Sequence, residues 1–247
     1  GETSIASGAS AEGTSGTISF ATAGAGADGM SNALGVITGA SSAGTTGTVA
    51  LATGVASNSA GGDVSLAVGA GNYLDGGDVQ LTAGLTTAAA QAGGNIVFIG
   101  GEGSNANTND GGDGGDIQLF GGEAKGSNIN DNAGNVEVFG GTSAYGYGGS
   151  VRLSAGVSAS TSSGAVLVDS PNAGSGGVSG LMVLSTGTSS AGATGSITLV
   201  TGASTSGRSG YISVLVGEGN SAQGGHISIG AGMTTDSKTG GNIRMKT

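Results

Sequence analysis

The sequence predicts an all-β fold, a parallel β-solenoid of about sixteen short coils, each of about 15 to 16 residues. The first observation behind this prediction is a recurring pattern: Gly, polar, aliphatic, any, aliphatic, any, small, Gly. Clear copies of it lie at 62–69 and 77–84. The second observation is that the aliphatic positions recur at a nearly constant spacing, with longer spacings only in the central repeats. We therefore expect one short strand in each repeat.

The two aliphatic positions of each repeat, which we call the apolar ladder, are separated by one residue. Side chains two residues apart point to the same face of a strand, and Val and Ile favour strands. The first position is filled by Thr3, Ile18, Leu34, Val49, Val64, Val79, Ile96, Ile117, Val136, Val151, Val166, Met182, Ile197, Ile212, Ile227 and Ile243. The second is filled by Ile5, Phe20, Val36, Leu51, Leu66, Leu81, Phe98, Leu119, Val138, Leu153, Val168, Leu184, Leu199, Val214, Ile229 and Met245.

Glycine is expected at the corners of each coil. A small residue such as Thr53 or Ala83 follows the apolar ladder and is itself followed by Gly in most repeats. Glycine tolerates positive φ and a close approach of backbones, and a sharp corner needs both. Small polar stretches such as 40–44 then form the predicted return side of the coil. An antiparallel meander is the competing topology, but near-identical repeats stack most simply in parallel and in register.

The composition excludes several classes of protein. There are 57 glycines but only one proline, Pro171, and glycine does not recur at every third residue, so collagen is excluded. The periodic aliphatic residues argue against a disordered linker. Sixteen acidic residues against six basic ones give a net charge of -10, which argues against nucleic acid as a partner. No apolar run is long enough to span a membrane, and no export signal precedes Gly1, so a mature product is one interpretation.

We expect one repeat domain over 1–247, with irregular, longer coils at about 99–135. The extra residues there are rich in side-chain oxygen, which suits calcium. The candidate ligands that we select are Asp110, Asp113 and Asp116. Asn and Asp are also ordinary turn residues, so a turn without a metal is the alternative interpretation. We expect no cofactor, unless these side chains bind calcium.

Two surfaces are candidates for contacts between copies of the chain. Neither end carries a segment that would cover an open sheet edge, so we expect either end-to-end polymerisation, with Ile5, Ile243 and Met245 at the join, or a slice of a longer protein. In the central coils, outward positions hold Val97, Ile99, Phe120 and Phe139. This stripe predicts a lateral contact with a second copy, unless a local loop covers it.

The residues that common catalytic sites need are scarce. His226 is the one histidine, it stands where other repeats have Asp or Asn before the strand, and cysteine is absent. Histidine-dependent triads and the usual zinc sites therefore lack parts. A coil of about 15 residues is also too thin to form the carboxylate groove of polysaccharide-cleaving β-helices. We expect that the chain is not an enzyme.

The whole repeat pattern resembles the Gly/Ser/Thr/Ala-rich β-solenoids of secreted surface proteins, among them adhesins and ice-binding proteins. This resemblance implies an extracellular or cell-surface location and a non-catalytic role. We expect a structural protein of a fibre or surface appendage that forms a homopolymer. The alternatives are an adhesin that binds glycans and an ice-binding protein. Against ice binding, the aligned threonines Thr22, Thr38, Thr53, Thr186 and Thr201 fall on the predicted inward side of the corner.

Overall fold

The computed structural model describes residues 2–11, 14–26, 29–220 and 223–246, and these residues form no helix and no strand. The predicted parallel β-solenoid is therefore wrong. The prediction of a solenoid rested on the alternation of apolar side chains. This alternation indicates that the side chains share one face of an extended segment, but it does not show that the segment has a hydrogen-bonded neighbour. Backbone hydrogen bonds in the described residues close loops and turns, and none of them joins one segment of the apolar ladder to another. Without such a neighbour, an extended segment is not part of a sheet.

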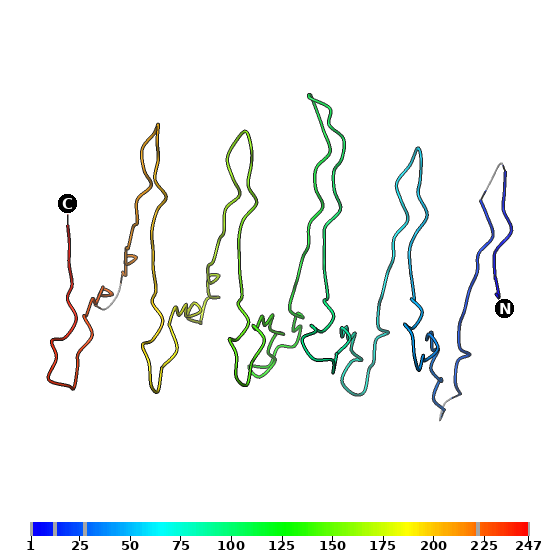
Figure 1. Ribbon diagram of the computed structural model, residues 1–247, viewed down its shortest axis with the longest axis horizontal. Helices are drawn as coiled ribbons and strands as arrows, with labels where there is room; N and C mark the ends of the chain where they lie inside the picture. The colour runs from blue at the N-terminus through cyan, green and yellow to red at the C-terminus, as the bar shows by residue number, and fades with distance from the viewer. Residues whose placement is uncertain (1, 12–13, 27–28, 221–222, 247) are drawn as a thin grey trace. The chain divides into compact units, whose positions relative to one another are not determined.

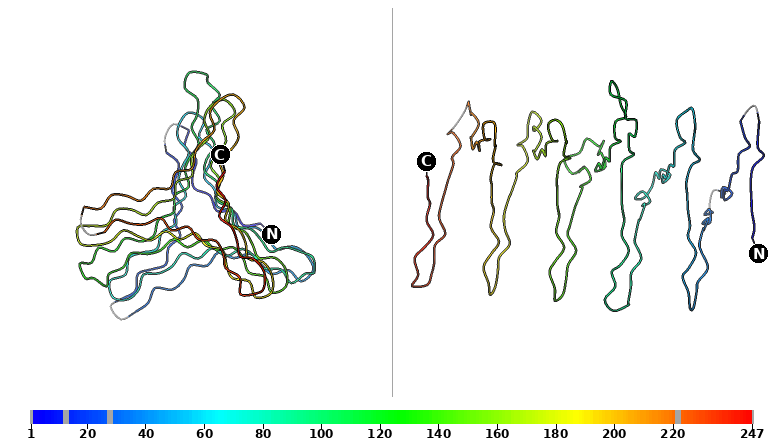
Figure 2. Two further views of the ribbon diagram at one scale, coloured as in Figure 1. Left: turned by 90° about the vertical axis from the view of Figure 1, so that its left-hand side faces the viewer. Right: turned by 45° about the horizontal axis from the view of Figure 1, so that its top comes forward.

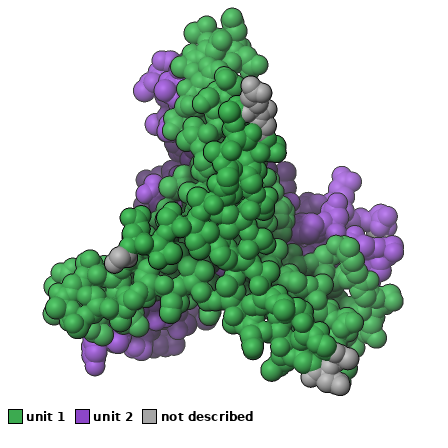
Figure 3. Space-filling model, turned by 90° about the vertical axis from the view of Figure 1, so that its right-hand side faces the viewer, with its two compact units in different colours: residues 1–134 green, residues 135–247 purple. Residues whose placement is uncertain are grey.

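The chain is instead a series of narrow loops whose two limbs run side by side, as Figures 1 and 2 both show. Contacts divide it into two units, Gly1–Gly134 and Asn135–Thr247, which Figure 3 distinguishes by colour. Within each unit, an extended segment that carries apolar residues alternates with a loop of small and polar residues. The polar stretches that were expected to form the return side of each coil are these loops.

Many loops are closed at their base by one backbone hydrogen bond, which we call the glycine clasp. The N–H of a glycine just before one apolar segment donates to the carbonyl oxygen of a glycine just after the preceding segment. The donor–acceptor distances are 2.8 to 3.0 Å, for the donor and acceptor pairs Gly16 and Gly8, Gly94 and Gly84, Gly115 and Gly101, Gly134 and Gly122, Gly149 and Gly141, Gly164 and Gly156, and Gly241 and Gly232.

The clasp explains why its donor position is glycine. A Cβ added to Gly149 would lie 2.8 Å from the amide nitrogen of Gly141, and one added to Gly134 would lie 2.9 Å from that of Gly122. By contrast, a Cβ added to either acceptor glycine, Gly141 or Gly122, would meet nothing within 4 Å. Close approach of two backbones is thus the reason for glycine at these donor positions.

The expected positive φ at glycine corners does not occur. No glycine in the described part of the chain has a positive φ. Among the other described residues, Ala90 alone has a positive φ, at 59°. The chain reverses at the loop tips, where several reversals share a serine turn. The amide of a glycine donates to the hydroxyl of a serine three residues earlier, at 2.9 to 3.0 Å, in the donor and acceptor pairs Gly44 and Ser41, Gly146 and Ser143, Gly192 and Ser189, and Gly207 and Ser204.

The longer repeats at 99–135 place their extra residues in the loops. The clasps from Gly101 to Gly115 and from Gly122 to Gly134 enclose more residues than the clasp from Gly141 to Gly149. The asparagines of these loops accept hydrogen bonds from nearby amides, with Asn107 N to Asn105 Oδ1 at 3.0 Å and Asn130 N to Asn128 Oδ1 at 3.0 Å. Such bonds hold short turns in place.

Candidate functional site

The apolar ladder is the most extensive chemical feature of the structure, and it is exposed. The described residues include no buried hydrophobic side chain. Exposure is nevertheless regular within a repeat, because the first position is less exposed than the second. In one repeat Ile197 is 53 % exposed and Leu199 is 73 % exposed, and in another Ile212 is 56 % and Val214 is 67 % exposed. Both positions therefore leave apolar side chains exposed on the extended segments of each unit.

The total accessible surface shows how much burial the single chain lacks. The chain exposes 24410 Å² for a mass of 22.7 kDa. A compact folded monomer of that mass exposes about 9,500 Å², and a fully unfolded chain about 33,000 Å². The difference between the observed surface and that of a compact monomer is about 15,000 Å². An isolated chain in this conformation therefore keeps most of its apolar surface in water.

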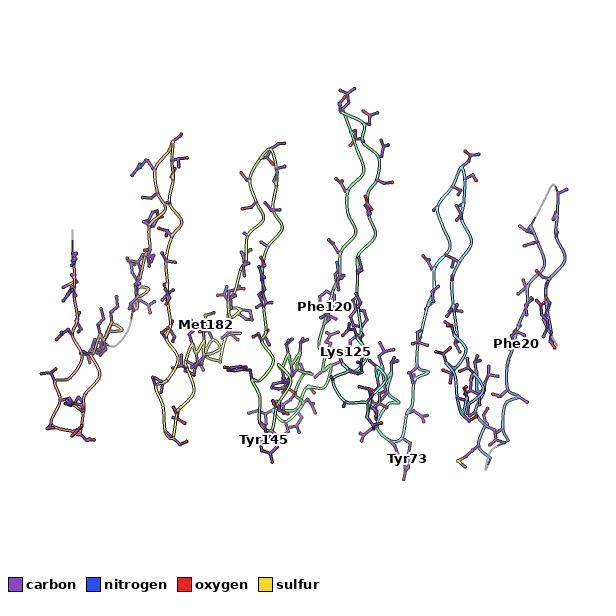
Figure 4. All side chains as sticks on the ribbon, viewed as in Figure 1. Phe20, Tyr73, Phe120, Lys125, Tyr145 and Met182 are labelled. Atoms are coloured by element: carbon purple, nitrogen blue, oxygen red, sulfur yellow. The ribbon has the colours of Figure 1, made fainter. Side chains whose placement is uncertain are left out.

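The residues of the predicted lateral contact are exposed. Val97, Ile99, Phe120 and Phe139 are 68 %, 83 %, 83 % and 81 % exposed, so no described segment of the chain covers them. Phe120 lies along the limb of a loop in Figure 4. These side chains are available to a neighbouring copy, and the lateral contact itself stays a prediction.

The predicted end residues are exposed as well, with Ile5, Ile243 and Met245 at 66 %, 54 % and 93 %. The open sheet edges that were to join them are absent, since the described residues near both ends form no strand. These residues extend the apolar ladder and make no separate surface of their own.

The predicted calcium ligands Asp110, Asp113 and Asp116 are exposed, and the first two lie in the loop between Gly101 and Gly115, whereas Asp116 follows that loop. Nowhere in the described ranges do three or more acidic, histidine or cysteine side chains gather as a metal site would require. The asparagines that precede Asp110 in this loop, Asn105 and Asn107, accept amide hydrogen bonds in short turns. The structure therefore shows turns at this place and does not bring the predicted ligands together.

Two further observations concern cavities and membranes. The described residues enclose no pocket, and His226 is exposed. Across the same residues there is no helix long and apolar enough to cross a bilayer. The absence of enzymatic activity and of cofactors stays a prediction.

Sequence reasoning overlooked the tyrosines. Tyr73, Tyr145, Tyr147 and Tyr211 are 91 %, 104 %, 103 % and 87 % exposed. In Figure 4, Tyr73 and Tyr145 stand at the ends of their loops. The signal was present in the sequence, because Tyr145 and Tyr147 are large aromatic residues in a stretch of otherwise small ones.

Comparison with known proteins adds no relative: no family model, curated protein or solved structure matches the chain. The functional argument therefore rests on the residues and on their surroundings in this structure.

Proposed function

We propose that the chain is a non-enzymatic structural protein of an extracellular fibre or surface appendage, and that it assembles by self-association along the apolar ladder. The observation that carries this proposal is the combination of a periodic apolar ladder with the absence of a buried core in the described residues. Large exposed apolar surfaces on proteins mark interaction sites. A surface that recurs in every repeat fits a partner that recurs in the same way.

A second copy of the chain is the partner that matches the ladder along its length. Its apolar residues have the same spacing, so two copies in register place apolar residue against apolar residue at each repeat. A stable interface buries about 800 Å² on each partner. The surplus surface of about 15,000 Å² relative to a compact monomer is many times that amount. One chain can thus contact several neighbours, as a fibre requires.

The energy of such contacts accumulates quickly. Burial of one Val, Leu, Ile or Phe side chain contributes about 1.5 to 3 kcal/mol. A few repeats that engage a neighbour therefore offset the loss of translational and rotational freedom, which is about 4 to 15 kcal/mol. The net charge of -10 opposes association at long range and keeps separate chains in solution.

The proposed assembly differs from the end-to-end join that the sequence suggested. That join needed open sheet edges beside Ile5, Ile243 and Met245, whereas the described residues form no sheet. The ladder supports contacts along the sides of the chain, with Val97, Ile99, Phe120 and Phe139 widening it in the central repeats. The extracellular location rests on the resemblance to secreted repeat proteins.

The experiment is sedimentation of the purified chain over a range of concentrations, together with electron microscopy of the pellet. We expect fibres, and we expect Phe98→Asp to lower the sedimented fraction at least tenfold, because it replaces an apolar ladder residue with a charge. Asn95→Asp adds the same charge one residue before the ladder and serves as the matched control. We expect it to sediment like the unmodified chain.

The result that would contradict the proposal is a chain that stays monomeric at all concentrations. Equal loss of sedimentation in both variants would also contradict it, because the effect would then come from charge and not from the ladder. Glycan binding or thermal hysteresis by the monomer would favour the adhesin or the ice-binding alternative.

A further inference from the structure

The loop between Gly141 and Gly149 carries two tyrosines that nothing in the structure explains. Tyr145 is 104 % exposed and Tyr147 is 103 % exposed, so neither ring contacts the rest of the described chain to a measurable extent. Neither hydroxyl takes part in a hydrogen bond within the described residues. Exposure is shared by the other large side chains of the described chain, and these two rings are distinguished by lying two residues apart in one loop of small residues.

Two hydrogen bonds hold the backbone of the loop that carries the two rings. The glycine clasp holds its base, with Gly149 N to Gly141 O at 2.8 Å, and the serine turn holds its tip, with Gly146 N to Ser143 Oγ at 2.9 Å. Tyr145 stands at the end of this loop in Figure 4. The residues beside the rings are small, so a ring from another copy can approach without a steric barrier.

Charge favours this loop over the loop of Tyr73 as a meeting point of two copies. From Glu137 to Arg152 the intervening residues carry no charge, although the chain as a whole has a net charge of -10. Tyr73, by contrast, lies two residues before Asp75. Two identical loops around Tyr145 therefore approach each other with less repulsion than two loops around Tyr73.

We infer that Tyr145 and Tyr147 form an oxidative cross-linking site at which copies of the chain become joined through dityrosine. This inference rests on the proposed self-association, which brings copies together. Disulfides cannot serve the same purpose, because the chain has no cysteine. The oxidant is hydrogen peroxide, used by a haem peroxidase.

The reaction balances as follows. The peroxidase removes one hydrogen atom from the phenol oxygen of each of two tyrosines, and one hydrogen peroxide is reduced to two water molecules. The two phenoxyl radicals couple through a new bond between ring carbons next to the hydroxyl-bearing carbons. Each coupled carbon then gives up its proton while its phenol oxygen regains one, which restores both aromatic rings.

The test compares two double variants that each keep two exposed tyrosines. The assembled chain is treated with peroxidase and hydrogen peroxide, and covalent dimers are measured on a denaturing gel together with dityrosine fluorescence. We expect Tyr145→Phe with Tyr147→Phe to lower dimer formation at least tenfold. Tyr73→Phe with Tyr211→Phe is the matched control and should keep at least half of the dimers.

Equal yields from the two double variants would overturn the inference, since coupling would then be indifferent to position. Sedimentation of each sample without oxidant separates this outcome from failure of the proposed function. If the chain assembles but couples without preference, only the cross-linking site is wrong. If the chain stays monomeric, self-association is wrong, and equal coupling in the same gel would overturn the tyrosine site as well.

Discussion

The amide of Gly149 donates a hydrogen bond of 2.8 Å to the carbonyl oxygen of Gly141, and this bond ties the end of a loop to its beginning. The same relationship joins Gly134 to Gly122 at 2.8 Å. In both pairs the donor position has no room for a side chain, while the acceptor position has. This asymmetry distinguishes glycines that the loop needs from glycines that it tolerates.

Alanine at the donor position should open the loop. In Gly149→Ala the new methyl would lie 2.8 Å from the amide nitrogen of Gly141, so one of the two backbones must shift, and we expect this shift to break the clasp. A lost hydrogen bond of this kind costs about 0.5 to 1.5 kcal/mol, which corresponds to roughly two- to tenfold faster amide exchange at residue 149. Gly141→Ala is the control and should leave that exchange unchanged. Equal exchange rates in the two variants would show that the clasp does not restrict the loop.

Removal of the serine turn should loosen the loop tip. Ser189 accepts a hydrogen bond from Gly192 N at 3.0 Å. In Ser189→Ala the amide of Gly192 loses this acceptor, and we expect it to exchange about two- to tenfold faster in a hydrogen-exchange measurement by NMR. Ser190→Ala removes the neighbouring hydroxyl and should have no such effect. The turn would have no role if both variants behaved alike.

The central apolar side chains should strengthen contacts between copies. Phe120 and Phe139 are 83 % and 81 % exposed, so each has most of its ring to bury against a neighbour. We expect Phe120→Ser with Phe139→Ser to raise the concentration at which half of the chain sediments by at least tenfold. The matched variant Tyr73→Ser with Tyr211→Ser also removes two exposed rings and should change that concentration less. A larger effect of the tyrosine pair would refute the lateral contact.

Salt should promote assembly. Sixteen acidic residues face six basic ones, so copies of the chain repel each other at long range. Raising the salt concentration from about 0.01 M to about 1 M shortens the Debye length from about 30 Å to about 3 Å and screens this repulsion. The sedimented fraction should therefore increase with sodium chloride. A decrease would mean that ion pairs hold the copies together.

The positions of the loops and turns were predicted from the sequence better than the fold was. Glycines that frame each apolar segment, such as Gly141 and Gly149, are the residues that close the loops. Asn105 and Asn128 act in turns, as one of the two interpretations of the oxygen-rich stretch expected. These features depend on residues a short distance apart, and backbone sterics and side-chain hydrogen bonding specify them locally.

The fold was predicted wrongly because the apolar ladder does not specify which surface its side chains contact. The alternation of Ile197 and Leu199 indicates that both side chains share a face, but it is the same whether that face meets the next repeat or another molecule. Hydrogen-bonded pairing of strands is likewise not encoded by one segment alone. The positive φ expected at the corners was wrong for a related reason, since glycine is equally needed where two backbones approach closely.

The lengths of the loops vary while their bases do not. Gly115 follows Gly101 by 14 residues, and Gly149 follows Gly141 by 8. In both cases the clasp brings the end of the loop back to its beginning, and the next apolar segment starts there. Insertions between clasp glycines are therefore absorbed as protrusions, and the apolar segments keep their order. Where a clasp closes a loop, the length of that loop is therefore uncoupled from the position of the apolar segments on either side of it.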